Sequence, residues 1–93
     1  MNTRVMVFEE KHIPRFFVIN DEVDVRRVLA SVAVERLNDG YWYDERESHT
    51  LQQLVASGQS KRVAEWMAMR SAKGYKYETY VVYPVESPKH HID

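Results

Sequence analysis

Cysteine is absent from this chain of 93 residues, and glycine and proline occur only three times each. Without cysteine there are no disulfides, no thiolate ligands for a metal and no cysteine nucleophile, so the fold does not depend on redox state. The three glycines all lie where a helix is expected to end, and the chain has no phosphate-cradling, metalloprotease or serine-hydrolase motif. These absences exclude several common classes of enzyme.

Long apolar runs are also missing. The first run, at residues 5–8, is much too short for a signal peptide or a membrane span, and no later segment approaches the roughly 18 apolar residues that a span needs. The formal net charge of -1 gives the chain no overall field that would attract phosphate or an anionic membrane. We therefore expect a cytoplasmic protein that makes no membrane contact.

What the chain does contain is typical of a globular protein. Hydrophobic residues make up 44% of it and aromatic residues 12%, which is enough for one small core. We predict a single domain over residues 1–85. The polar segment 86–93 is predicted to be a flexible tail.

Two short runs near the start predict a β-hairpin. Residues 5–8 and 16–19 are β-branched and aromatic, and a polar linker separates them. Both runs are apolar at successive positions, so side chains on both faces of the sheet are apolar. Either helices cover one face and a partner covers the other, or the strands are central in the sheet. We predict a homodimer on this basis.

Three helices are predicted next. The first begins after Asp21 and stops at Asp39–Gly40, with an apolar arc on one side. Asp44, Glu45 and Glu47 lead into a second helix, which ends at Gly58. Ser60 is predicted to cap the third, which Gly74 ends. The apolar arc of the first helix comprises Val25, Val28, Leu29, Val32, Ala33 and Leu37.

A last strand is predicted over residues 76–85, which are rich in tyrosine and valine, and Pro84 places its end at a sheet edge. The order of elements is therefore strand, strand, helix, helix, helix, strand. This order predicts the α+β class, as a two-layer sandwich in which helices pack on a small, mainly antiparallel sheet.

The sequence gives little support for a catalytic site or a metal site. His90, His91 and Asp93 cluster in the tail, but adjacent side chains point apart and chelate one ion poorly, so we predict no metal site. Neighbouring acids such as Glu9 and Glu10 are explained by turns and helix starts. We expect no enzymatic activity and no cofactor.

The stretch SGQSKRVAEWM, residues 57–67, has two interpretations. A helix-turn-helix unit would use residues 50–73 to bind DNA, and residues 57–76 carry five basic residues and one acidic residue. Leu54, Gln59 and Ala64 depart from that motif at its small, apolar and branched positions. An ordinary αα-hairpin packed on the sheet explains Gly58 equally well. DNA binding is therefore the alternative function.

The third helix also carries an aromatic and basic face. Trp66 lies at the border of its core side, with Arg62 and Arg70 one turn away in either direction. Tryptophan, arginine and methionine are enriched in protein interfaces. Trp66 could instead fold inward onto Tyr77 and Tyr80. The predicted binding residues are Arg62, Trp66, Met69, Arg70 and Lys73, together with Tyr41 and Tyr43, either as an exposed pair flanking a buried Trp42 or in the reverse arrangement.

The last third of the chain, VAEWMAMRSAKGYKYETYVVYPV, resembles the C-terminal helix and strand of small bacteriophage accessory proteins. Val63, Trp66, Arg70 and the Tyr-x-Tyr-Glu segment 75–78 carry this resemblance. Such proteins are commonly non-enzymatic binders that inhibit or sequester a host factor. The resemblance implies a binder of this kind. Together with the aromatic and basic face, it leads us to predict a small binding protein whose partner is a host or phage protein, or a small anionic ligand.

Overall fold

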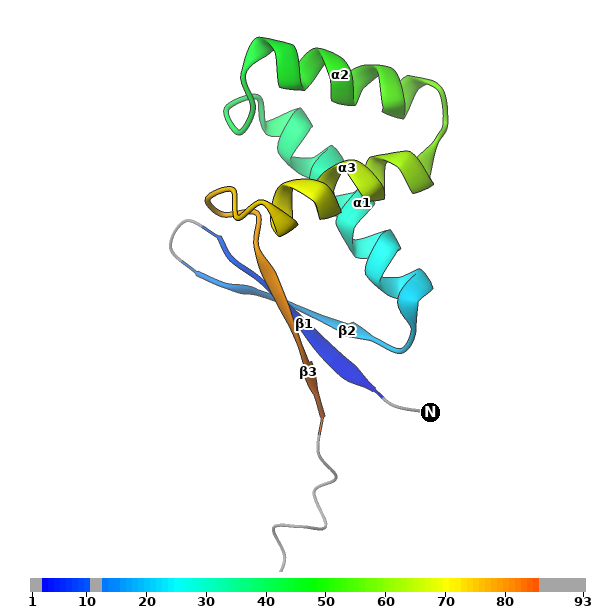
Figure 1. The fold of residues 1–93 in the computed structure, drawn as a ribbon, viewed down its shortest axis with the longest axis vertical. Helices are drawn as coiled ribbons and strands as arrows, with labels where there is room; N and C mark the ends of the chain where they lie inside the picture. Colours follow the sequence, from blue (N-terminus) through cyan, green and yellow to red (C-terminus); the bar gives the residue numbers. More distant parts are fainter. Residues whose placement is uncertain (1–2, 11–12, 86–93) are drawn as a thin grey trace, which may run out of the picture.

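The computed structural model of this chain describes residues 3–10 and 13–85 (Figure 1). The predicted tail, with His90, His91 and Asp93, lies outside the described residues. The elements are β1 (Arg4–Phe8), β2 (Arg15–Ile19), α1 (Glu22–Asp39), α2 (Glu45–Ala56), α3 (Ser60–Ala72) and β3 (Tyr80–Pro84). This is the predicted order, and the α+β class is confirmed.

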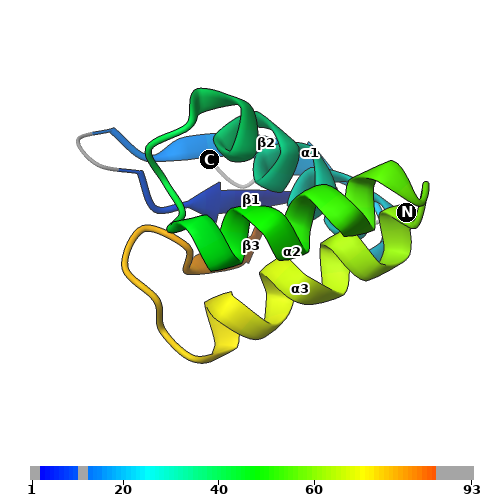
Figure 2. The same cartoon turned by 90° about the horizontal axis from the view of Figure 1, so that it is seen from above.

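The strands form one antiparallel sheet in the order β2-β1-β3, with β1 in the centre. Met6, Phe8 and Ile19 point from one face of the sheet into the core and are fully buried. The helices lie over this face, and α1 packs most extensively on α3 (Figures 1 and 2). The result is the predicted two-layer arrangement. The helices contribute Val25, Leu29, Val32 and Ala33 of α1, Leu51 of α2, and Val63, Ala64 and Met67 of α3 to the core.

The ends of α1 and α2 follow local sequence signals. The carboxylate of Asp21 accepts a hydrogen bond from the backbone N–H of Asp24 at 2.9 Å, and Gly40 ends α1 with a φ of 82°. Asp44 and Glu47 form a reciprocal capping box at the start of α2. These contacts satisfy backbone groups that a helix end would otherwise leave without partners.

The start of α3 differs from the prediction. Gln59 occupies the N-cap position without a side-chain hydrogen bond, and Ser60 is the first helical residue. Gly58 reverses the chain with a φ of 69°, and the carbonyl of Gln59 then accepts the first helical bond, from the N–H of Val63 at 3.0 Å. The first turn of α3 therefore has no side-chain cap.

The last strand is shorter than the predicted 76–85. It begins only at Tyr80, because residues 75–79 form turns in which Tyr77 has a φ of 68°. These turns direct Glu78 inward, where its side chain is buried. The strand lies at a sheet edge, as Pro84 predicts. No helix in the described residues has the length and apolar character needed to cross a membrane.

Candidate binding surfaces

The exposed side of α3 holds part of the predicted binding face. Arg62, Met69 and Lys73 are exposed, and their spacing of seven and four residues places them on one side of the helix. Trp66 lies between them and is half-buried. Its ring packs edge-on against Tyr43, with centroids 5.1 Å apart, rather than onto Tyr77 or Tyr80. Arg62, Met69 and Lys73 are thus the members that α3 presents to solvent.

Arg70 points away from this exposed side. Its Nε and Nη2 donate to the two carboxylate oxygens of Glu78, at 2.6 and 2.7 Å, and its Nη1 donates to Glu47. The side chain of Arg70 is 14% exposed and that of Glu78 only 5%. The guanidinium also lies over the rings of Trp66, at 4.8 Å, and Tyr75, at 4.2 Å. The charge of Arg70 is therefore fully paired within the fold.

The Arg70 pKa reflects this environment. Burial alone lowers the pKa, but the hydrogen bonds and negative charges of Glu78 and Glu47 outweigh it and raise the pKa above the ordinary value. The network ties the end of α3 to the start of α2 and to the turns before β3. It organises the residues next to Trp66.

Residues 41–43 form bends rather than a strand, so their side chains do not alternate between buried and exposed positions as they would in a strand. Tyr41 is 63% exposed, Trp42 is half-buried, and Tyr43 is only 9% exposed and belongs to the core. The expectation that Tyr41 and Tyr43 share one environment is wrong, because Tyr43 turns inward under Trp66. Only Tyr41 of this pair has a largely exposed ring.

A second arginine, Arg36 of α1, is buried in the core and was missed from the sequence. It is 1% exposed and lies over the rings of Trp42, at 4.2 Å, and Phe8, at 5.4 Å. Its Nη2 donates to the carbonyl of Glu9 and to the carboxylate of Glu10. Position 36 lies on the same side of α1 as the predicted apolar arc. This spacing is the one feature of the sequence that could have indicated the burial of Arg36.

Burial of Tyr43 predicts a loss of stability in alkali. Burial and then the charge of Glu78 raise the pKa of its hydroxyl, which Arg36 and Arg70 only partly offset. The folded protein keeps this proton while the unfolded chain loses it near pH 10, so stability is full below about pH 10 and falls above it. Urea unfolding between about pH 8 and 11 measures this effect. The free energy of unfolding of Tyr43→Phe should fall less steeply with pH than that of the wild type. Equal slopes of free energy against pH in the two proteins would show that Tyr43 does not cause the loss of stability in alkali.

Tyr43→Phe should change stability little at neutral pH. The Tyr43 hydroxyl is buried without a hydrogen bond of normal geometry among the described residues, so removing it should change the free energy of unfolding by less than about 1 kcal/mol. This makes the variant a clean probe of the alkaline effect.

The face of the sheet that points away from the helices is entirely apolar. We call it the outer sheet face; it consists of Val5, Val7, Phe16, Val18, Val81 and Tyr83. The register pairs Val5 with Val18 and Tyr83, and Val7 with Phe16 and Val81, so the six side chains are contiguous.

This face is also well exposed. Phe16 and Val18 are 66% and 70% exposed, and Val81 and Tyr83 are 51% and 52% exposed. No charged residue interrupts it, although one-sided sheets usually place polar residues on the solvated face. A contiguous apolar patch of this kind is typical of an interaction surface. The first hairpin indicated it from the sequence, but Val81 and Tyr83 were missed because the register of β3 was unknown.

Residues 50–73 cover most of α2, a three-residue turn and α3, which together form a helical hairpin. DNA binding by this segment stays a prediction. No group of three or more histidine, aspartate or glutamate side chains in residues 3–10 and 13–85 is arranged to hold a metal ion.

Comparisons of this chain with known protein families, with curated proteins and with solved structures find no match. The surfaces described above are therefore the basis for inferring function.

Proposed function

We propose that this protein is a small non-enzymatic binding protein that acts as a homodimer, with the outer sheet face as the dimer interface. The observation that carries the proposal is the apolar character of all six residues on that face. In a monomer, four of these side chains would expose more than half of their surface to water. Packing a second sheet against them removes that exposure.

A second copy fits this face better than the residues outside the described ranges do. These are Met1, Asn2, Lys11, His12 and the segment 86–93, of which only Met1, Pro88 and Ile92 are apolar. They offer too few apolar side chains to cover three strands. A symmetric partner supplies a matching uncharged surface, since a two-fold interface uses the same patch on both copies.

The size of the face also suits a dimer. Three strands spaced about 4.8 Å apart, each five residues long, present an area of roughly 15 by 17 Å. This is the apolar centre of an interface, and the exposed Val85, which directly follows β3, can help to extend it toward the usual 800 Å² or so per partner. Burying four half-exposed side chains on each copy contributes about 1 kcal/mol each. These contacts sum to about 8 kcal/mol before association costs roughly 4 kcal/mol or more. A micromolar dissociation constant corresponds to about 8 kcal/mol net, so the remainder must come from Val5, Val7 and contacts at the border of the face.

Dimerisation leaves the helices available for a further partner. The exposed residues Arg62, Met69 and Lys73 of α3 lie on the helical layer, away from the sheet. A methionine between two cations suits an acidic and apolar protein surface. We place the partner contact here, and the resemblance to phage accessory proteins makes a host factor the candidate partner.

The alternative function, DNA binding through residues 50–73, has fewer cations to use. Arg70 is paired with Glu78 and Glu47, so it cannot neutralise a phosphate without breaking that network. The exposed cations that remain would support only weak binding that falls steeply with salt. Tight, sequence-selective DNA binding at physiological salt would instead favour this alternative.

Sedimentation equilibrium over a concentration series tests the proposal. A monomer of 11.0 kDa should associate reversibly and reach twice that mass in the micromolar range. The dimer should persist in high salt, because no charged residue lies on the outer sheet face. A mass that stays at the monomer value up to millimolar concentration would rule it out.

A further inference from the structure

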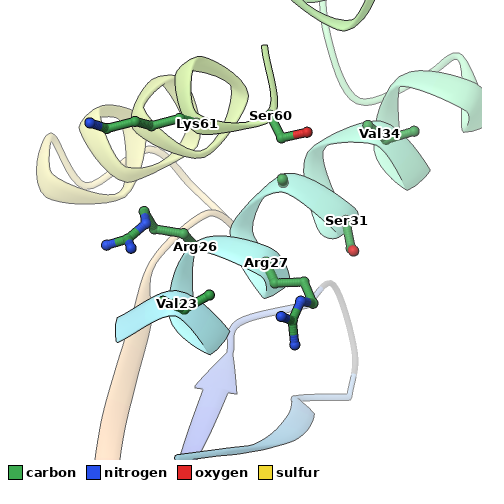
Figure 3. A pocket seen from close by; sticks show the side chains of 8 residues that line it. Val23, Arg26, Arg27, Ser31, Val34, Ser60 and Lys61 are labelled. Atoms are coloured by element: carbon green, nitrogen blue, oxygen red, sulfur yellow. The ribbon is translucent and has the colours of Figure 1, made fainter. Parts of the chain in front are cut away.

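A groove runs along the solvent-facing side of α1, where the first turn of α3 forms its second wall (Figure 3). Its volume is about 740 Å³, which lies in the range of small-molecule sites. None of its residues belongs to the sheet, so it is separate from the proposed dimer interface. The lining consists of Val23, Arg26, Arg27, Ala30, Ser31 and Val34 of α1 with Ser60 and Lys61 of α3.

The floor of the groove is apolar. Val23, Ala30 and Val34 follow one another at intervals of seven and four residues, which puts them on one stripe of α1. This stripe borders the arc that faces the core: Ala30 is partly buried and packs against the core, whereas Val23 is 49% exposed. The helix therefore carries a second apolar strip over about 16 Å, at 1.5 Å per residue. An apolar group of similar length can lie along it.

The walls of the groove are basic. Arg26 comes from α1 and Lys61 from α3, and the ends of both side chains point to the same side of the groove (Figure 3). Neither makes an ion pair with a carboxylate in the described part of the chain. Arg27 is different, because it pairs with Asp24 at 3.1 Å. No acidic residue lines the groove, so nothing within it neutralises Arg26 and Lys61.

Two hydroxyl groups complete the lining. Ser31 and Ser60 offer hydrogen bonds to an oxygen-rich group, and Ser60 stands in a first turn that contains no acidic residue. Cations and hydroxyls beside an apolar strip match a ligand with an anionic end and an apolar body. A purely apolar ligand would leave Arg26 and Lys61 without partners, and a bare anion would leave the strip exposed to water.

We propose that this groove binds a small amphipathic anion, in which a phosphate or carboxylate group is joined to an apolar chain or ring. Arg26 and Lys61 hold the anionic group, and the apolar body lies on Val23, Ala30 and Val34. The anion can be a free metabolite or the headgroup of a single lipid, since both present the same chemistry to the groove.

The test is an NMR titration of the intact protein with octyl phosphate below the concentration at which it self-associates. We expect saturable shifts at Val23, Ala30 and Val34, with a dissociation constant between about 10 µM and 1 mM. Inorganic phosphate should bind at least about tenfold more weakly, because it lacks the apolar body. Octyltrimethylammonium should not bind, since its charge has the wrong sign.

Charge and shape variants locate the site. Arg26→Gln with Lys61→Gln should weaken octyl phosphate binding by about tenfold, as expected for two exposed ionic contacts. The matched control, Arg46→Gln with Lys76→Gln, changes the net charge equally at exposed positions outside the groove and should leave the affinity within about twofold. Ser31→Trp should block the groove and abolish the shifts without loss of stability, because Ser31 is exposed.

Three results would overturn the proposal. Equal affinities for octyl phosphate and inorganic phosphate would remove the role of the apolar strip. Equal losses of affinity for octyl phosphate in the two double variants would show that the ligand is attracted only by the overall charge of the protein. Binding of an acidic amphipathic peptide, without any binding of octyl phosphate, would identify the groove as a protein-binding surface. A titration with vesicles that contain anionic lipid distinguishes a headgroup from a free metabolite as the source of the anion.

Discussion

Arg70→Ala is expected to lower the free energy of unfolding by about 3 to 5 kcal/mol, because it leaves a buried carboxylate without its partner. Glu78 is 5% exposed and receives two hydrogen bonds from Arg70, at 2.6 and 2.7 Å. For a chain of this size, the melting temperature should fall by more than about 12 °C. Thermal and urea unfolding measure both quantities.

The control and the rescue separate this ion pair from a general effect of charge. Arg62→Ala removes an exposed arginine from the same helix and should change stability by no more than about 0.5 kcal/mol. Replacing both partners, Arg70→Met with Glu78→Leu, should recover much of the loss, since apolar side chains need no hydrogen bonds. An Arg70→Ala variant that melts like the wild type would show that the pair does not hold the fold together.

Phe16→Glu is expected to abolish the dimer and leave the monomer folded. Phe16 is 66% exposed and points away from the core, so its replacement opens no cavity. In the dimer the same change buries two unpaired carboxylates beside apolar side chains, which should weaken association by more than about 100-fold. Sedimentation measures the association, and circular dichroism checks the fold.

Met69→Glu is the matched control. Met69 is 60% exposed on α3, outside the sheet, so the same type of substitution should leave the dimer unchanged. It should instead weaken binding of the proposed partner to the helical layer. Loss of the dimer in Met69→Glu but not in Phe16→Glu would place the interface on the helices.

The fold follows from the sequence wherever the determining contacts are local. Asp21 caps α1 through a backbone group only three residues away, and Gly40 ends the same helix with its own backbone conformation. Contacts of this range are visible in a sequence as short patterns. The helix order and the first hairpin are therefore predictable.

Long-range contacts decide what the sequence could not reveal. Arg70 lies on a helix and Glu78 in the turn region before β3, and their pairing buries Glu78 just before the strand begins at Tyr80. The burial of Arg36 depends on Phe8, which comes from β1 in a distant part of the chain, and on Trp42, which follows the end of α1. The aromatic and basic face on α3 stays a prediction, and Arg70, which was assigned to that face, is instead paired with Glu78 and Glu47 inside the fold.

The outer sheet face illustrates the same limit. Apolar residues at successive positions of the first two strands indicated a second apolar face, and the homodimer was predicted from them. The contribution of β3 to this face depends on its register with β1, which the sequence does not reveal. That register places Val81 opposite Val7 and Tyr83 opposite Val5. A strand that is distant in sequence therefore completes the surface on which the proposed function rests.

The most direct test of this function is an NMR measurement on a mixture of isotope-labelled and unlabelled copies, which detects contacts only between different molecules. The proposed dimer predicts nuclear Overhauser effects between copies among Phe16, Val18 and Val81 of the outer sheet face. Contacts between copies that involve only the helices, or no such contacts at millimolar concentration, would contradict a function built on this face.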